Sequence, residues 1–88
     1  MPTVFIPALL RDSTGGRESV TARGFTVRQV IDDLDAQFPG IKLRLLDGAG
    51  LKKGLTIAVG SQIASQGLSQ PVPENAEVHF VPAISGGG

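Results

Sequence analysis

Cysteine, tryptophan and tyrosine are all missing from this 88-residue chain. Without cysteine it can form no disulfide, no thiolate metal site and no thiol nucleophile, which fits a reducing compartment. Without tryptophan and tyrosine it has few rings for nucleic-acid bases to stack on. Eight basic residues balance eight acidic ones, so no net field attracts nucleic acid or an anionic membrane. We therefore expect no nucleic-acid partner and no membrane partner.

Long apolar runs are missing too. No run approaches the ~20 residues that cross a bilayer, and the N-terminus lacks the basic and apolar regions of a signal peptide. We therefore expect a cytoplasmic protein. A chain of this length makes one domain with a modest core and little room for an enclosed active site.

The N-terminal third predicts a β-hairpin. Residues 3–10, TVFIPALL, predict a strand with a bulge or an early end near Pro7, because proline cannot donate to a strand ladder. RDSTGG then supplies turn formers, and residues 17–22, RESVTA, predict a second, shorter strand. The two strands would be joined by a loose turn at Gly15–Gly16.

Residues 26–40, TVRQVIDDLDAQFPG, predict the main helix. Thr26 is a good N-cap, Gln29 completes a capping-box pattern, and Pro39 and Gly40 end the helix. The apolar residues follow helical spacing and form one stripe: Val27, Val30, Ile31, Leu34 and Phe38.

The remaining segments complete a mixed sheet. Residues 41–50 fit either a short helix or a strand, residues 55–59 predict a strand, and residues 62–64 predict a short returning strand after a turn at Gly60. The last strand, 77–83, places Val78 and Phe80 on one face and His79 and Val81 on the other.

This order of elements predicts an α+β protein with the β-grasp fold. A mixed sheet of about four to five strands would pack on one main helix, with the first and last strands parallel at its centre. We expect the domain to span residues 1–83 and a flexible tail to span residues 84–88.

Three features invite a functional interpretation that the pattern does not favour. Gly15–Gly16 joins two strands, whereas a phosphate-binding loop joins a strand to a helix. The acidic run Asp32, Asp33 and Asp35 fits a solvated helix face better than a metal site. His79 is the only histidine and has no recognisable catalytic partner, so we expect it to contact a partner and not to catalyse.

The face of the sheet away from the helix is a candidate binding surface. Pro7 or Phe5, Ile63 and Val81 could form an exposed apolar patch there, which on a small protein usually marks an interaction site. The alternative is that loops or a second copy of the chain cover it.

The chain ends in SGGG. Glycine loses the most entropy on ordering, so this triplet does not stabilise the fold. Either it is a frayed end, or a thin tail of Gly86, Gly87 and Gly88 delivers the terminal carboxylate into another enzyme's active site. With no thiol in the chain, that carboxylate is its most usable reactive group.

The element order and the ending ENAEVHFVPAISGGG resemble those of the ubiquitin-like sulfur carriers. These include the molybdopterin synthase small subunit, the thiamine-pathway carrier and the carrier that feeds cysteine synthesis. The segment IPALLRDSTGGRESVTARG, followed by TVRQVIDDLDAQFPGIKLRLLD, is most similar to the cysteine-synthesis branch. Ala8 and Arg11 also match the molybdopterin synthase small subunits.

The resemblance implies a carrier with no bound cofactor and no catalysis of its own. A ubiquitin-activating-type adenylyltransferase would adenylate Gly88 with ATP, and sulfide from a sulfurtransferase would displace AMP and leave a thiocarboxylate. The sulfur acceptor would be a cysteine synthase or the molybdopterin synthase large subunit. A ubiquitin-like protein modifier and a β-grasp interaction module with an idle tail remain alternatives.

The resemblance also assigns contact residues. Pro7, Ile63 and Val81 match the family's apolar contact surface, and Arg11 matches a position that contacts the activating enzyme. The reactive residue is Gly88 as written, or Gly87 if the mature end differs. Gly60 stands where the family often has asparagine, and Pro7 where a larger apolar residue is common.

Overall fold

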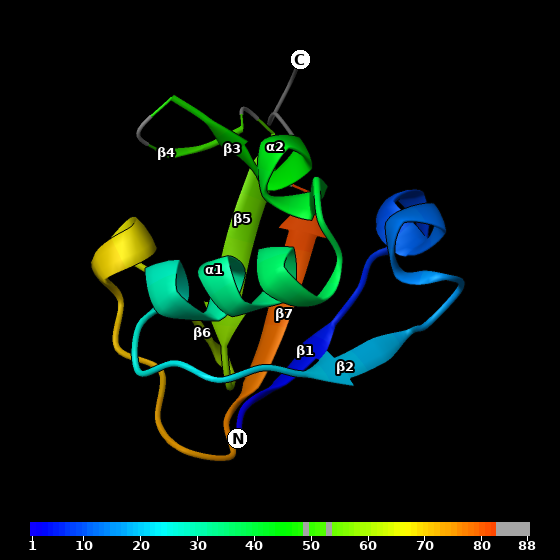
Figure 1. The fold of residues 1–88 in the computed structure, drawn as a ribbon. Helices are drawn as coiled ribbons and strands as arrows, with labels where there is room; N and C mark the ends of the chain where they lie inside the picture. Colours follow the sequence, from blue (N-terminus) through cyan, green and yellow to red (C-terminus); the bar gives the residue numbers. More distant parts are fainter. Residues whose placement is uncertain (49, 53, 83–88) are drawn as a thin grey trace.

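The computed structural model describes residues 1–48, 50–52 and 54–82. Its centre is a five-stranded mixed sheet in the order β2-β1-β7-β5-β6, and helix α1 lies across one face of this sheet (Figure 1). The strands are β1 (Thr3–Phe5), β2 (Ser19–Thr21), β5 (Leu55–Val59), β6 (Gln62–Ile63) and β7 (Glu77–Pro82).

The helical elements and a small second sheet complete the chain. The α-helices are α1 (Val27–Gln37) and α2 (Ile41–Leu45), and the 3₁₀ helices are η1 (Ala8–Thr14) and η2 (Gly67–Ser69). A second antiparallel pair consists of β3 (Leu46–Asp47) and β4 (Gly50–Leu51). The ambiguous segment 41–50 is thus a short helix that passes directly into a strand. In the described ranges, no helix is long and apolar enough to cross a bilayer.

The predicted β-grasp arrangement is confirmed. β1 runs parallel to β7, with Val4 opposite Val78, and antiparallel to β2, with Val4 opposite Val20. β7 is the central strand and pairs antiparallel with β5 on its other side. Two parallel strands need a crossover connection, and α1 supplies it.

The start of α1 is fixed much as its sequence predicts. The Thr26 hydroxyl accepts a hydrogen bond from the backbone N–H of Gln29 at 3.3 Å. The Gln29 side chain reaches back one residue further than a simple capping box requires and accepts from the Phe25 N–H at 2.8 Å. Both bonds satisfy backbone donors near the helix end and set the direction in which the chain enters α1.

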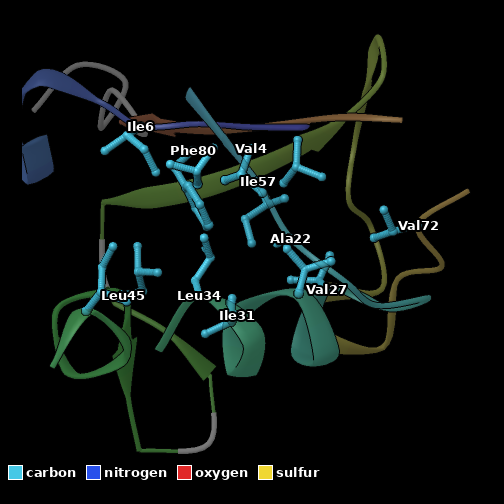
Figure 2. Packing of buried hydrophobic residues seen from close by; sticks show 14 of the residues in the cluster. Val4, Ile6, Ala22, Val27, Ile31, Leu34, Leu45, Ile57, Val72 and Phe80 are labelled. Carbon is cyan, nitrogen blue, oxygen red and sulfur yellow. The ribbon is translucent and has the colours of Figure 1, made fainter. Parts of the chain in front are cut away.

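The core lies between the sheet and the helices (Figure 2). Val27, Val30, Ile31 and Leu34 of α1 are buried, as the stripe predicts, and Phe38 is half-buried against them. The sheet contributes the alternate residues of its central strands. The buried members on this side are Val4, Ile6, Ile57, Val78 and Phe80.

The early end predicted near Pro7 is confirmed, since β1 stops at Phe5, and residues 8–10 of the predicted segment lie in η1 and not in a strand. The backbone of Pro7 is extended, and the N–H of Leu10 then donates to the Pro7 carbonyl at 2.9 Å, which begins η1. Proline offers no N–H to continue the ladder, so the chain leaves the sheet. Leu10 is buried and Leu9 is 82% exposed, a separation that a helical turn allows.

The predicted Gly15–Gly16 hairpin turn is wrong in its extent. β1 and β2 are antiparallel neighbours, but the connection between them contains all of η1. Gly15, with φ 66°, is the left-handed cap that ends η1. The two glycines therefore end a helix, and do not by themselves reverse the chain.

Candidate functional site

One row of side chains crosses all five strands on the face of the sheet opposite α1. Directly paired positions in neighbouring strands point to the same face of a sheet. The recorded pairs join Ser19 to Phe5, Phe5 to His79, His79 to Ala58, and Ala58 to Ile63. We call these five residues the open-face row.

The centre of the open-face row is an aromatic stack. The rings of Phe5 and His79 lie parallel within 1°, with centroids 4.4 Å apart. On its own strand, His79 Nε2 lies 3.3 Å from Glu77 Oε1. The one histidine of the chain therefore packs flat on the Phe5 ring and lies beside the Glu77 carboxylate.

Ile63 and Val81 are exposed on the same side of the molecule. Ile63 is 61% exposed at one end of the open-face row, and Val81, two residues after His79, is 39% exposed opposite Thr56. The predicted alternation is confirmed, because Val78 and Phe80 are buried on the other face. Ile63, His79 and Val81 therefore share one accessible surface.

Arg11 lies at the border of this surface. Its Nε atom donates to the Ile6 carbonyl at 3.1 Å, and its Nη2 atom lies 3.8 Å from Glu18 Oε1. The backbone bond restrains the Arg11 side chain, while the 3.8 Å ion pair adds little because the Glu18 side chain is 80% exposed. The Arg11 side chain remains 38% exposed.

Pro7 lies just beyond the end of β1 and outside the open-face row. It is half-buried and lines a hollow with Leu9, Arg44 and Leu55. Phe5 is the residue of the first strand that belongs to the row. Pro7 and Phe5 were alternative candidates for the apolar patch on the sheet. Phe5 belongs to the row because β1 ends there, before Pro7.

The three acids of α1 accept hydrogen bonds from backbone N–H groups or form an ion pair. Asp32 forms an ion pair with Lys42 at 2.6 Å, Asp33 accepts from the Arg23 N–H, and Asp35 accepts from the Gly40 and Lys42 N–H groups. Across residues 1–48, 50–52 and 54–82, no three acidic or histidine side chains gather closely enough to hold a metal ion. These acids hold α1 to its neighbouring segments.

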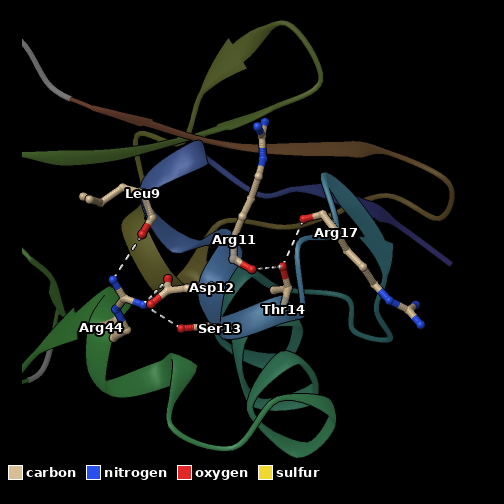
Figure 3. A network of polar contacts seen from close by, with 7 residues as sticks. All are labelled: Leu9, Arg11, Asp12, Ser13, Thr14, Arg17 and Arg44. Carbon is tan, nitrogen blue, oxygen red and sulfur yellow. Dashed lines mark hydrogen bonds and ion pairs between the residues drawn. The ribbon is translucent and has the colours of Figure 1, made fainter.

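A polar network holds η1 against α2 (Figure 3). Arg44 donates to Asp12 Oδ1 at 2.7 Å, to Ser13 Oγ at 2.7 Å, and to the Leu9 carbonyl at 3.1 Å. The hydrogen bond from Arg44 lowers the pKa of Asp12 below its usual value. No single sequence motif predicts this network, because Arg44 and Asp12 are 32 residues apart in the chain.

The predicted tail residues Gly86, Gly87 and Gly88 lie outside the described part of the chain. The place from which they continue is described, since β7 runs to Pro82 and pairs there with Leu55 of β5. The chain thus leaves the sheet from its central strand, with β1 on one side and β5 on the other.

Comparisons with known proteins agree with this geometry. The ThiS family model matches residues 4–87. Sulfur carrier protein CysO of Mycobacterium tuberculosis is 39% identical over 90 aligned residues, which cover 97% of each chain.

Two crystal structures are closely similar. One chain of the BexX/CysO complex of Amycolatopsis orientalis superposes with a TM-score of 0.91 at 37% identity, over 99% of this chain and 100% of that one. CysO of M. tuberculosis gives a TM-score of 0.89 at 37% identity, over 96% of this chain and 100% of that one.

Proposed function

The chain belongs to the ThiS family, and from that membership we propose that it is a sulfur carrier for cysteine biosynthesis. The observation that carries the proposal is the 39% identity to sulfur carrier protein CysO over 97% of both chains. The match is nearly end to end, and the family model spans residues 4–87, which include Gly86 and Gly87. The partner enzymes bind the folded domain, and the terminal carboxylate carries the sulfur.

The chemistry proceeds at Gly88. An adenylyltransferase of the ubiquitin-activating type transfers AMP from ATP to the carboxylate and releases pyrophosphate. Sulfide supplied by a sulfurtransferase attacks the acyl carbon, AMP leaves, and a thiocarboxylate remains. The acceptor enzyme, a cysteine synthase, takes the sulfur from that group. ATP is thus the activating enzyme's substrate, and the carrier needs no cofactor of its own.

The composition supports a carrier in place of an enzyme. The chain has no cysteine and one histidine, and that histidine is stacked on Phe5 beside Glu77. Neither neighbour is a nucleophile that His79 could activate. We propose instead that His79 and Arg11 contact the partner protein, together with the exposed side chains of Ile63 and Val81.

Mass spectrometry tests the proposal. The chain is incubated with the adenylyltransferase from its own genome, ATP and a sulfur source, and its intact mass is measured. The expected change equals the replacement of one oxygen by sulfur. A variant that lacks Gly87 and Gly88 is the control and should keep its mass.

The alternative functions give different results in the same reaction. Conjugates of higher mass on lysine-containing proteins would show a protein modifier. Delivery of sulfur to a molybdopterin synthase large subunit, and not to a cysteine synthase, would place the chain in the other pathway. An unchanged intact mass under conditions that activate a known carrier would overturn the proposal.

A further inference from the structure

A hollow of about 180 Å³ opens at the end of the sheet where β7 finishes. We call it the tail-root hollow. Its walls are mainly apolar, and two cationic side chains stand at it: the lining includes Pro7, Leu9, Leu10, Leu55, Arg44 and Lys52. None of its exposed residues belongs to the open-face row.

The topology places the tail-root hollow around the exit of the tail. Pro7 follows β1 and Leu55 begins β5, and these two strands flank β7 on either side. Leu55 is paired with Pro82, the last described residue of the chain. Six residues follow Pro82, and they can span at most about 20 Å. An enzyme that acts on Gly88 must therefore bring its surface close to this hollow.

The walls of the hollow are preorganised. Arg44 fixes η1 through Asp12, Ser13 and the Leu9 carbonyl, so the backbone of Leu9 is held while its side chain is 82% exposed. An exposed apolar side chain on a fixed backbone loses little conformational entropy when a partner covers it. The network in Figure 3 thus presents Leu9 ready for contact.

The positive charge at the hollow favours a partner that presents a negatively charged group. Arg44 and Lys52 contribute two positive charges, and Asp12 compensates one of them. Among the described residues that line the hollow, one positive charge is left beside an apolar surface that ends at Leu9. An apolar side chain next to a carboxylate complements this arrangement.

We propose that the tail-root hollow is a docking site for the adenylating enzyme, which places there an apolar side chain and a carboxylate from the mouth of its tail channel. This inference rests on the proposed function, since only an enzyme that takes up the C-terminus must approach this end. The adenylating enzyme is the first to do so. The hollow adds a second anchor to the open-face row, at the end of the sheet where Pro82 pairs with Leu55.

Steady-state kinetics of adenylation test the inference. The two substitutions are Leu9→Asp and Lys52→Glu, both at exposed positions. Leu43→Asp is the matched control, because Leu43 is 78% exposed on α2 but does not line the hollow. Arg28→Glu, exposed on α1, is the control for charge. Pyrophosphate release is measured over a range of carrier concentrations.

We expect each hollow variant to raise KM about tenfold with kcat unchanged, while the controls match the wild type. Higher salt should raise the KM of the wild type more than that of Lys52→Glu. If the wild type and controls are adenylated and the hollow variants have the same KM, the inference is overturned and the proposed function stands. If the wild type is not adenylated, the proposed function itself fails.

Site-specific cross-linking gives a readout independent of activity. The chain has no cysteine, so Leu9→Cys and Leu43→Cys each provide one thiol for a benzophenone-maleimide label. We expect the label at position 9, and not at position 43, to cross-link to a peptide of the adenylating enzyme that contains an acidic residue. A cross-link only within the carrier, or only between two carriers, would overturn the inference.

Discussion

Arg44 of α2 and Asp12 of η1 are joined by an ion pair of 2.7 Å between Nη1 and Oδ1. The same guanidinium also bonds to Ser13 and to the Leu9 carbonyl. Charge-assisted hydrogen bonds of this length are among the stronger polar contacts in proteins. One side chain of α2 therefore binds three residues of η1, which lies in the connection between β1 and β2.

Replacing the acid of this pair should change how stability depends on pH. Arg44 lowers the pKa of Asp12 from its usual 3.8, with burial opposing this in part. A carboxyl whose folded-state pKa is depressed stabilises the fold above its unfolded-state pKa, and that stabilisation is lost as pH falls through the folded-state value. Asp12→Asn should therefore have a lower free energy of unfolding than the wild type at neutral pH. This difference in free energy should become smaller as pH falls below 3.8.

The measurement is urea unfolding of both proteins between neutral and strongly acidic pH. Asp47→Asn, which removes the same charge from another exposed position, controls for the change in net charge, and its difference from the wild type is subtracted at each pH. A gap between Asp12→Asn and the wild type that stays constant down to the acid limit would contradict the ion-pair argument.

Gly24 should tolerate no side chain. Its φ is +150°, and a Cβ there would lie 2.7 Å from the Val30 nitrogen and 2.9 Å from the Gln29 carbonyl carbon, both backbone atoms of α1. We expect Gly24→Ala to lower the free energy of unfolding by at least about 3 kcal/mol. Gly15 also has a positive φ, but its Cβ position is open. Gly15→Ala should cost only about 1–2 kcal/mol.

Urea denaturation of the two glycine variants checks this difference. Gly15 lies in the left-handed αL region, whereas φ +150° at Gly24 is much rarer for residues with a side chain. The excess loss at Gly24 therefore measures this larger backbone strain together with the collision with the helix backbone. Equal losses for the two variants would show that the entry to α1 can shift to make room.

Helical periodicity and capping made α1 predictable. Thr26 and the stripe ending at Phe38 agree on one helix, and its burial follows the pattern. The segment after Pro7 was not predictable in the same way. Its apolar run Ala8-Leu9-Leu10 suits a strand or a helical turn equally, and Arg44, distant in sequence, fixes the outcome through tertiary contacts.

The sequence predicted which side chains of β7 lie on the open face, but not which side chains of the neighbouring strands lie beside them. Alternation along β7 correctly separated His79 and Val81 from Val78 and Phe80. It could not show that Phe5 stacks on His79, because the register between two strands more than 70 residues apart depends on the whole sheet. The tail-root hollow was missed for the same reason, since its walls come from three separate regions of the chain.

Ile63 offers the simplest test of the open-face row. It is 61% exposed on the edge strand β6, so Ile63→Asp should change the free energy of unfolding by less than about 0.5 kcal/mol. If the face binds the adenylating enzyme, a charge there should weaken association about tenfold or more. Calorimetry with the purified enzyme measures the affinity, and Leu43→Asp is the matched control. Equal affinities of Ile63→Asp and the wild type would remove β6 from the interface.

The stack of Phe5 on His79 should be measurable as a coupling free energy. A double-mutant cycle with Phe5→Ala and His79→Ala is expected to give about 0.5–1 kcal/mol of interaction. The control cycle pairs Phe5→Ala with Ile63→Ala, three strand spacings or about 14 Å apart, and should be additive within about 0.5 kcal/mol. Thermal unfolding of the six proteins supplies both values. A Phe5–His79 coupling no larger than that of the control would mean that the two stacked rings do not stabilise each other. A partner would then contact two independent side chains and not one prearranged surface.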